Sequence, residues 1–147
     1  MGFQSDYMRQ TFLPSASADK AKGNLGIKGQ WIFYIELAGL TDADVITAWT
    51  PGFAGTINKV EFVSKVAVTT GAKAADLNLE IGTTNLTGGV VGLTSANCTP
   101  KGVVVAGTPV TAASTFTATD TISVEAANVT TFVEGDGWLI VSYTQGT

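Results

Sequence analysis

A chain of 147 residues is long enough for one domain with its own core, yet its composition is unusual for a domain surrounded by water. Charged residues make up 14% of the chain and hydrophobic residues 45%, whereas ordinary soluble domains have roughly a quarter of their residues charged. A net charge of -4 argues against binding to a phosphate backbone, for which a duplex-binding protein uses a basic stripe, so we expect no nucleic-acid partner. The shortage of charge predicts instead that another protein covers part of the surface.

The first 29 residues have no sustained hydrophobic period, and Gly23 and Gly26 would end any helix that began near Asp19. We predict that residues 1–29 form an extended N-terminal arm lying on another surface; an ordinary disordered terminus fits the pattern equally well. No apolar run has the length of a signal peptide core or of a membrane helix, and we expect no membrane partner.

Regular structure is predicted to begin at Gln30. The run from Gln30 to Leu40 is apolar on both faces, which is typical of a strand covered from both sides. This strand is therefore either central in a sheet or part of an interface. A polar turn follows it, and a second strand is predicted at residues 45–50, ended by Pro51 and Gly52.

Residues 55–82 show the clearest alternation of apolar and polar side chains, which predicts two strands joined through residues 70–75 as a β-hairpin. Ile57 lies on the wrong parity for Val60, and this mismatch predicts a β-bulge near Asn58. The alternation assigns one set of side chains to the core: Val60, Phe62, Val66, Val68, Leu77, Leu79 and Ile81.

The remaining segments are shorter. One helical turn is predicted at residues 94–98, and residues 109–119 have the composition of a surface loop or edge strand. A strand is predicted at residues 121–126 and a last one, apolar on both faces, at residues 138–144. Trp31, Trp49 and Trp138 all lie in apolar strands, so we assign them to the core; the alternative is a platform on which sugars stack.

Roughly seven or eight short strands, spaced about ten residues apart and without long helices, predict an all-β fold. We expect residues 30–147 to form an antiparallel β-sandwich, jelly-roll-like in its strand order. An immunoglobulin-like topology is the alternative, because the number of strands does not separate the two.

Catalytic chemistry is poorly represented. The absence of histidine excludes Ser-His-Asp, Cys-His and His-metal sites, and the single Cys98 is interpreted as a small buried hydrophobe. Asp42 with Asp44, and Glu134 with Asp136, have the spacing of calcium ligands, but both pairs lie in predicted turns and lack further acidic positions. We therefore predict no catalytic, cofactor-binding or metal-binding residues and no enzymatic activity.

Three consecutive segments carry a resemblance to a known group of proteins: GTINKVEFVSKVAVTTGAKAADLNLEIG, then TGGVVGLTSANCTPKG, then AGTPVTAASTFTATDTISVEAANVTTFVEGDGWLIVSY. Together they span roughly Gly55 to Tyr143 and resemble the head decoration, or cement, proteins and related virion proteins of tailed bacteriophages. The resemblance implies a homotrimer on the outer capsid surface of the virion, bound to the major capsid protein and stabilising the shell. It supplies no catalytic residues. The alternative function is a fibre or spike domain that binds host carbohydrate.

Overall fold

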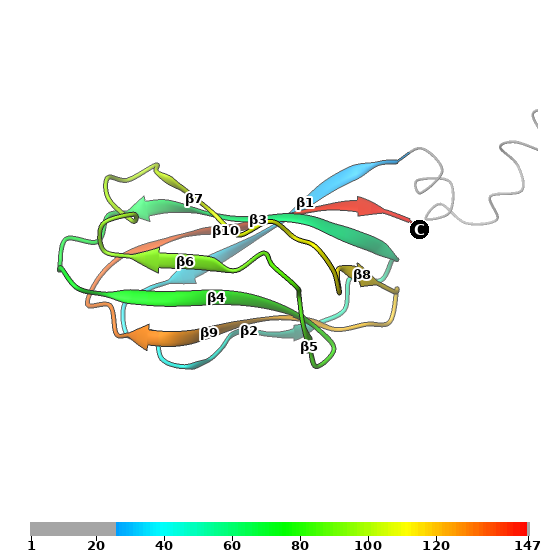
Figure 1. The fold of residues 1–147 in the computed structure, drawn as a ribbon, viewed down its shortest axis with the longest axis horizontal. Coiled ribbons are helices and arrows are strands. Elements are labelled where there is room, and N and C mark those ends of the chain that lie inside the picture. Colours follow the sequence, from blue (N-terminus) through cyan, green and yellow to red (C-terminus); the bar gives the residue numbers. More distant parts are fainter. Residues whose placement is uncertain (1–25, 147) are drawn as a thin grey trace, which may run out of the picture.

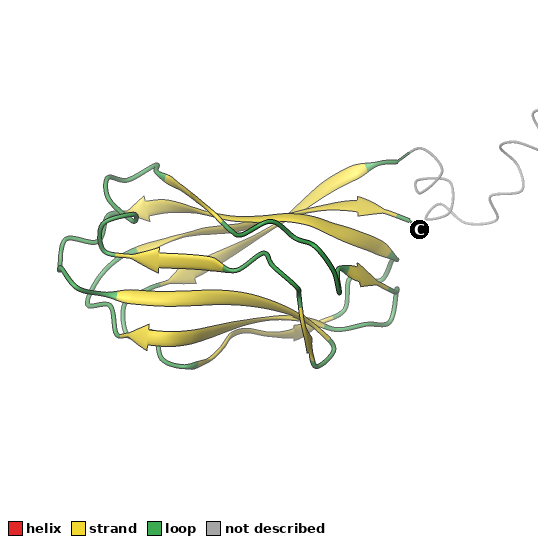
Figure 2. Cartoon of the chain, in the orientation of Figure 1, coloured by secondary structure: helices red, strands yellow, loops and turns green. Residues whose placement is uncertain are grey.

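The structure is a computed structural model that describes residues 26–146, and all regular structure in this range is β-strand (Figure 2). None of the described residues belongs to a helix long and apolar enough to cross a membrane. The strands are β1 (Lys28–Glu36), β2 (Ala43–Trp49), β3 (Gly55–Val66), β4 (Ala74–Ile81), β5 (Thr84–Asn85), β6 (Val91–Thr94), β7 (Val104–Ala106), β8 (Thr115–Phe116), β9 (Ile122–Thr130) and β10 (Asp136–Gln145).

Two antiparallel sheets pack face to face (Figure 1). The first sheet has the order β1-β10-β3-β7, with β8 also paired to β3; in the second, β2, β9 and β4 follow one another, and β5 and β6 pair with different ends of β4. If the two-residue strands β5 and β8 are set aside, this is the strand order of a jelly roll. The predicted sandwich is confirmed, and the immunoglobulin-like alternative is wrong because that fold places its first two strands side by side in one sheet.

Residues 55–82 form the two predicted strands, but the predicted hairpin between them is wrong. β3 pairs with β10, β7 and β8 in the first sheet, whereas β4 pairs with β9, β5 and β6 in the second. The connection between β3 and β4 therefore crosses from one sheet to the other. The predicted bulge is confirmed, because Lys59 opposes Ser142 while Ile57 opposes Tyr143, which leaves Asn58 as the extra residue.

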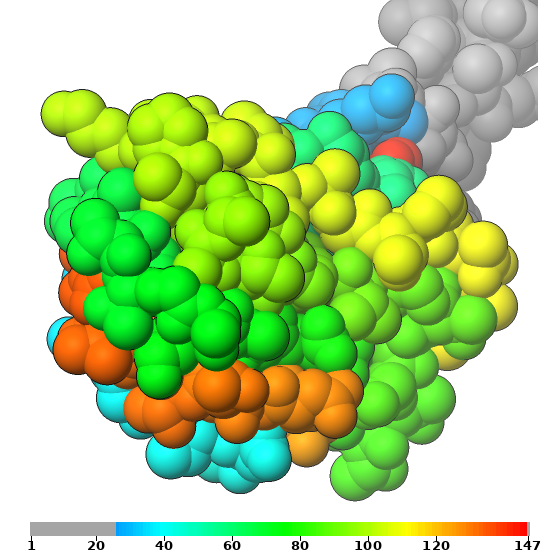
Figure 3. All heavy atoms as spheres, turned by 60° about the vertical axis from the view of Figure 1, so that its left-hand side comes forward, coloured from blue at the N-terminus to red at the C-terminus, as the bar shows by residue number. Residues whose placement is uncertain are grey.

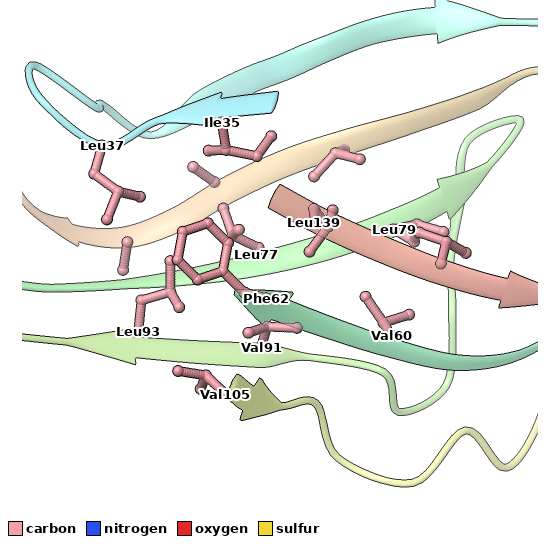
Figure 4. Packing of buried hydrophobic residues seen from close by; sticks show 14 of the residues in the cluster. Ile35, Leu37, Val60, Phe62, Leu77, Leu79, Val91, Leu93, Val105 and Leu139 are labelled. Carbon is pink, nitrogen blue, oxygen red and sulfur yellow. The ribbon is translucent and has the colours of Figure 1, made fainter. Parts of the chain in front are cut away.

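The core lies between the sheets, where side chains from both layers point toward one another (Figure 4). The predicted inward positions on β4 and most of those on β3 are buried or packed against this core. Val66 is the exception, with 44% of its surface exposed. A second register shift, at Lys65, changes the alternation before Val66 and turns its side chain outward.

One end of the core is aromatic. The rings of Trp31 and Trp49 meet edge to face with centroids 5.1 Å apart, and Phe53, Phe116 and Tyr143 complete the cluster. The assignment of Trp31 and Trp49 to the core is confirmed. Phe116 lies on β8, the edge strand predicted in the threonine-rich segment, yet its side chain is fully buried.

β1 begins at Lys28, two residues before the predicted start, and occupies the edge of the first sheet next to β10. The prediction that this strand is central in its sheet is therefore wrong. The alternative, that it forms part of an interface, stays a prediction. The predicted N-terminal arm lies outside the described residues apart from residues 26–29.

Candidate interaction surface

The outward face of the second sheet is polar and acidic. Directly paired positions on β2, β9 and β4 place four carboxylates on it: Asp44, Asp76, Glu80 and Glu125. Neighbouring polar groups hold two of them, because the Ser123 hydroxyl donates to Glu80 at 3.2 Å and the Asn128 amide donates to Asp76 at 2.8 Å. Figure 3 views the molecule from a side on which the orange β9, green β4 and yellow-green β6 lie at the surface. Burying the four carboxylates of this acidic face without partners would be costly, so we expect the face to stay in contact with water.

The outward face of the first sheet is apolar across its centre. Tyr34 on β1 opposes Trp138 on β10, Trp138 opposes Val63 on β3, and Val63 opposes Val104 on β7. The adjacent row begins with Ile32, which is 61% exposed. That row continues through Ile140 on β10 to Glu61 on β3. We call the large apolar side chains of these two rows the outer apolar face: Ile32, Tyr34, Val63, Val104, Trp138 and Ile140.

Polar residues border this face at both ends of the strands. At one end, the Gln30 amide donates to the Ser142 hydroxyl at 3.2 Å. Lys59 at the same end pairs in a salt bridge with Glu61, which lies beside Ile140 in the second row. At the other end lie Glu36, Asp136 and Lys65. An apolar centre with a polar rim is the usual anatomy of a surface that binds another protein.

Two aromatic rings on the face are held in place by charged neighbours. Tyr34 and Trp138 meet edge to face with centroids 5.3 Å apart, and the Lys65 ammonium lies 5.3 Å from the first ring centroid and 5.8 Å from the second. The Tyr34 hydroxyl donates to an Asp136 oxygen at 3.0 Å, and this hydrogen bond raises the pKa of Tyr34. Because these contacts already fix the rings, little side-chain freedom is left to lose on binding.

The assignment of Trp138 to the core is wrong, because the residue is 38% exposed. The strand carries apolar residues on both faces, and Trp138 belongs to the outward one. Together with Ile32, Val63 and Ile140, it lines an apolar hollow of about 310 Å³. The hollow has the chemistry to receive an apolar side chain from another protein.

The carboxylates considered as calcium ligands have structural contacts instead. Asp42 accepts a hydrogen bond from the Val129 backbone at 2.9 Å. The Glu134 carboxylate accepts hydrogen bonds from the backbone N–H and hydroxyl groups of Thr69 and Thr70, which lower its pKa to about 2. Within residues 26–146, no group of three or more acidic or cysteine side chains is placed to hold a metal ion.

Cys98 is fully buried, as predicted, and burial raises the pKa of its thiol. Its amide donates to the Thr94 carbonyl at 3.0 Å, which closes the single helical turn expected at residues 94–98. Cys98 therefore packs in the hydrophobic core, as a small buried side chain.

No family model matches the chain, and no curated protein matches it. Among solved structures, a similar chain occurs in one described as the capsid of Ralstonia phage GP4: it is 20% identical, with a TM-score of 0.45, and the match covers 83% of this chain and 86% of that one. At this TM-score and identity, the likeness does not assign a function.

Proposed function

We propose that this chain is a virion structural protein of a tailed bacteriophage, with a structural rather than a catalytic role. In this proposal it is a capsid decoration, or cement, protein that binds the outer surface of the head as a homotrimer and stabilises the shell. Its partners are further copies of itself and the major capsid protein. The resemblance over residues 55–143 and the jelly-roll order support the proposal, and the outer apolar face carries it.

The outer apolar face supplies a physical reason for binding. Burying apolar surface against another protein is favourable by about 25 cal/mol per Å², and this face is apolar in a domain that is otherwise poor in charge. The acidic face of the second sheet is then turned toward water. A trimer placed on a threefold site repeats each contact, so contacts that are weak singly become effectively intramolecular once the first has formed. The predicted arm over residues 1–29 is proposed to grip the shell.

Phage heads that lack this chain provide the direct test. We expect purified protein to bind them in multiples of three and to raise the temperature at which they release DNA. Trp138→Ser should weaken this binding by at least tenfold, because central aromatic side chains dominate protein interfaces. Asn78→Ser, on the outward face of the second sheet, is the matched control and should bind normally. Heads that neither bind the protein nor gain heat resistance would contradict the proposal.

The trimer is tested separately by light scattering at micromolar concentration, where we expect a mass that is a multiple of three chains. If the contact is obligate, the apparent melting temperature should rise with protein concentration. A mass corresponding to one chain would refute the trimer. Binding to the shell is tested independently, by the experiment with phage heads that lack this chain.

One observation favours the alternative of a fibre or spike domain that binds host carbohydrate. Trp138 and Tyr34 are exposed side by side, and sugars stack on such rings. Their edge-to-face arrangement, with an interplanar angle of 63°, offers no single flat platform. This alternative predicts that host polysaccharide changes tryptophan fluorescence in the native protein and that Trp138→Ser removes the change.

A further inference from the structure

The open edge of β1 is the feature that carries a further inference. Within residues 26–146, β1 pairs with β10 alone, so one side of a nine-residue strand has no neighbour. The strand contains no proline, and its register with β10 has no bulge. Proteins usually protect a long edge of this kind by bulges, by proline or by charges near its middle, because it pairs readily with another strand. Here the middle of β1 is Ile32.

The register shows which backbone groups the open edge presents. The Ile27 carbonyl accepts a hydrogen bond from the Gln145 N–H at 2.8 Å, and the pairing then continues without a shift along β1. Hydrogen-bonded pairs alternate along an antiparallel ladder, so the odd-numbered residues bond to β10. The even-numbered residues therefore direct their N–H and C=O groups to the open edge: Lys28, Gln30, Ile32, Tyr34 and Glu36.

We propose that the open edge of β1 pairs with β1 of a second copy of this chain, antiparallel and about a twofold axis at Ile32. This register uses the whole strand. It places Ile32 opposite its own counterpart and Lys28 opposite Glu36 of the other copy, at both ends of the pair. Opposite charges across a strand pair are favourable, and sliding the register by two residues would lose both ion pairs.

The pairing also extends the outer apolar face. Ile32 and Ile140 lie in one row across the first sheet, so two copies joined at β1 present a single row from Ile140 to its counterpart. The result is one continuous sheet formed from both first sheets, with an apolar band across its centre. Because the contact is twofold, it is separate from the proposed trimer, and it does not depend on a role in the virion.

Disulfide cross-linking tests the position of the axis. In the proposed pair the two Ile32 Cα atoms lie about 5.5 Å apart, which is within the range of a disulfide. We expect Ile32→Cys to form a covalent dimer when oxidised glutathione is the oxidant. Ile140→Cys is the matched control on the same face, and its counterpart would be three strand spacings, about 14 Å, away. Equal cross-linking of the two variants would overturn the proposal. The native Cys98 is buried and should not compete.

Charge reversal tests the register. Lys28→Glu and Glu36→Lys should each weaken dimer formation on the order of tenfold, since each replaces two attractive pairs by two repulsive ones. The double variant should restore it, because the pairs are re-formed with the charges exchanged. A double variant as weak as the single ones overturns this register.

Ile32→Lys provides the third measurement. The side chain is 61% exposed, so the fold should tolerate lysine, but two ammonium groups would then meet on the axis. We expect the dimer to be lost, and the amide hydrogens of residues 30, 32 and 34 to exchange faster than in the unmodified protein. If these amides are instead protected in a protein with the mass of one chain, the chain's own residues cover the edge and the proposal is wrong. This variant also allows the proposed trimer to be tested alone. Because the twofold contact is lost, light scattering should give the mass of three chains if the trimer forms and of one chain if it does not.

Discussion

Phe116→Ala tests whether the threonine-rich segment around β8 is part of the core. The Phe116 side chain is fully buried, and its ring centroid lies 5.2 Å from that of Trp31 and 5.8 Å from that of Phe53. Gly55 lies against the ring and has no side chain that could fill the space left by truncation. Removing a fully buried phenylalanine ring in this way costs about 3–5 kcal/mol.

That loss is large against the roughly 5–15 kcal/mol that stabilises a whole domain. We expect the melting temperature to fall by roughly 10 °C or more. The measurement is equilibrium urea unfolding followed by tryptophan fluorescence, at one fixed protein concentration so that self-association does not differ between samples. Val104→Ala is the control, because that side chain is 55% exposed and should change stability by less than about 1 kcal/mol. A loss below about 1 kcal/mol for Phe116→Ala would show that the segment is not part of the core.

Three further predictions concern single residues. The folded protein lowers the pKa of Glu134 from 4.5 to about 2, so the stability that this carboxylate contributes is present above about pH 4.5 and lost as the pH falls toward 2. The difference in melting temperature between the unmodified protein and Glu134→Gln should narrow over that window, and a difference independent of pH would refute the assignment. Cys98 should react with a thiol reagent much more slowly in the native protein than in urea, because it is buried and its pKa is raised; equal rates would contradict its burial. Gly55→Ala should destabilise by about 1–3 kcal/mol, since the added Cβ would lie 2.6 Å from the Thr144 carbonyl oxygen, and an unchanged urea midpoint would disprove this close approach.

The sequence predicted where strands lie better than which strands pair. Alternation identified the inward residues of β3 and β4, because period-2 patterning reports directly which face of a strand is buried. The same patterning contains no information on the partner strand. Both a hairpin and a crossing between two packed sheets bury Phe62 and Leu77, and only the structure distinguishes them.

The candidate surface was visible in sequence only in part. Apolar residues on both faces of β1 indicated that its outward side chains, Ile32 and Tyr34, require a partner surface. Val63 occupies a position expected to face water, and it joins the surface only through its register with Trp138 and Val104. Such a surface is formed by residues that are neighbours across paired strands. A single sequence does not show which strands pair or in which register.

The place of β10 in the first sheet determines when this domain can fold. β10 lies between β1 and β3, so neither of these strands has its main partner until residues 136–145 have been synthesised. Pairing between segments so distant in sequence is slow, because a long loop must close before any contact is gained. Until then, the inward side chains of β1 and β3, including Phe62, lack the completed first sheet that holds them against the core. The growing chain is therefore most prone to aggregate just before its last described strand emerges.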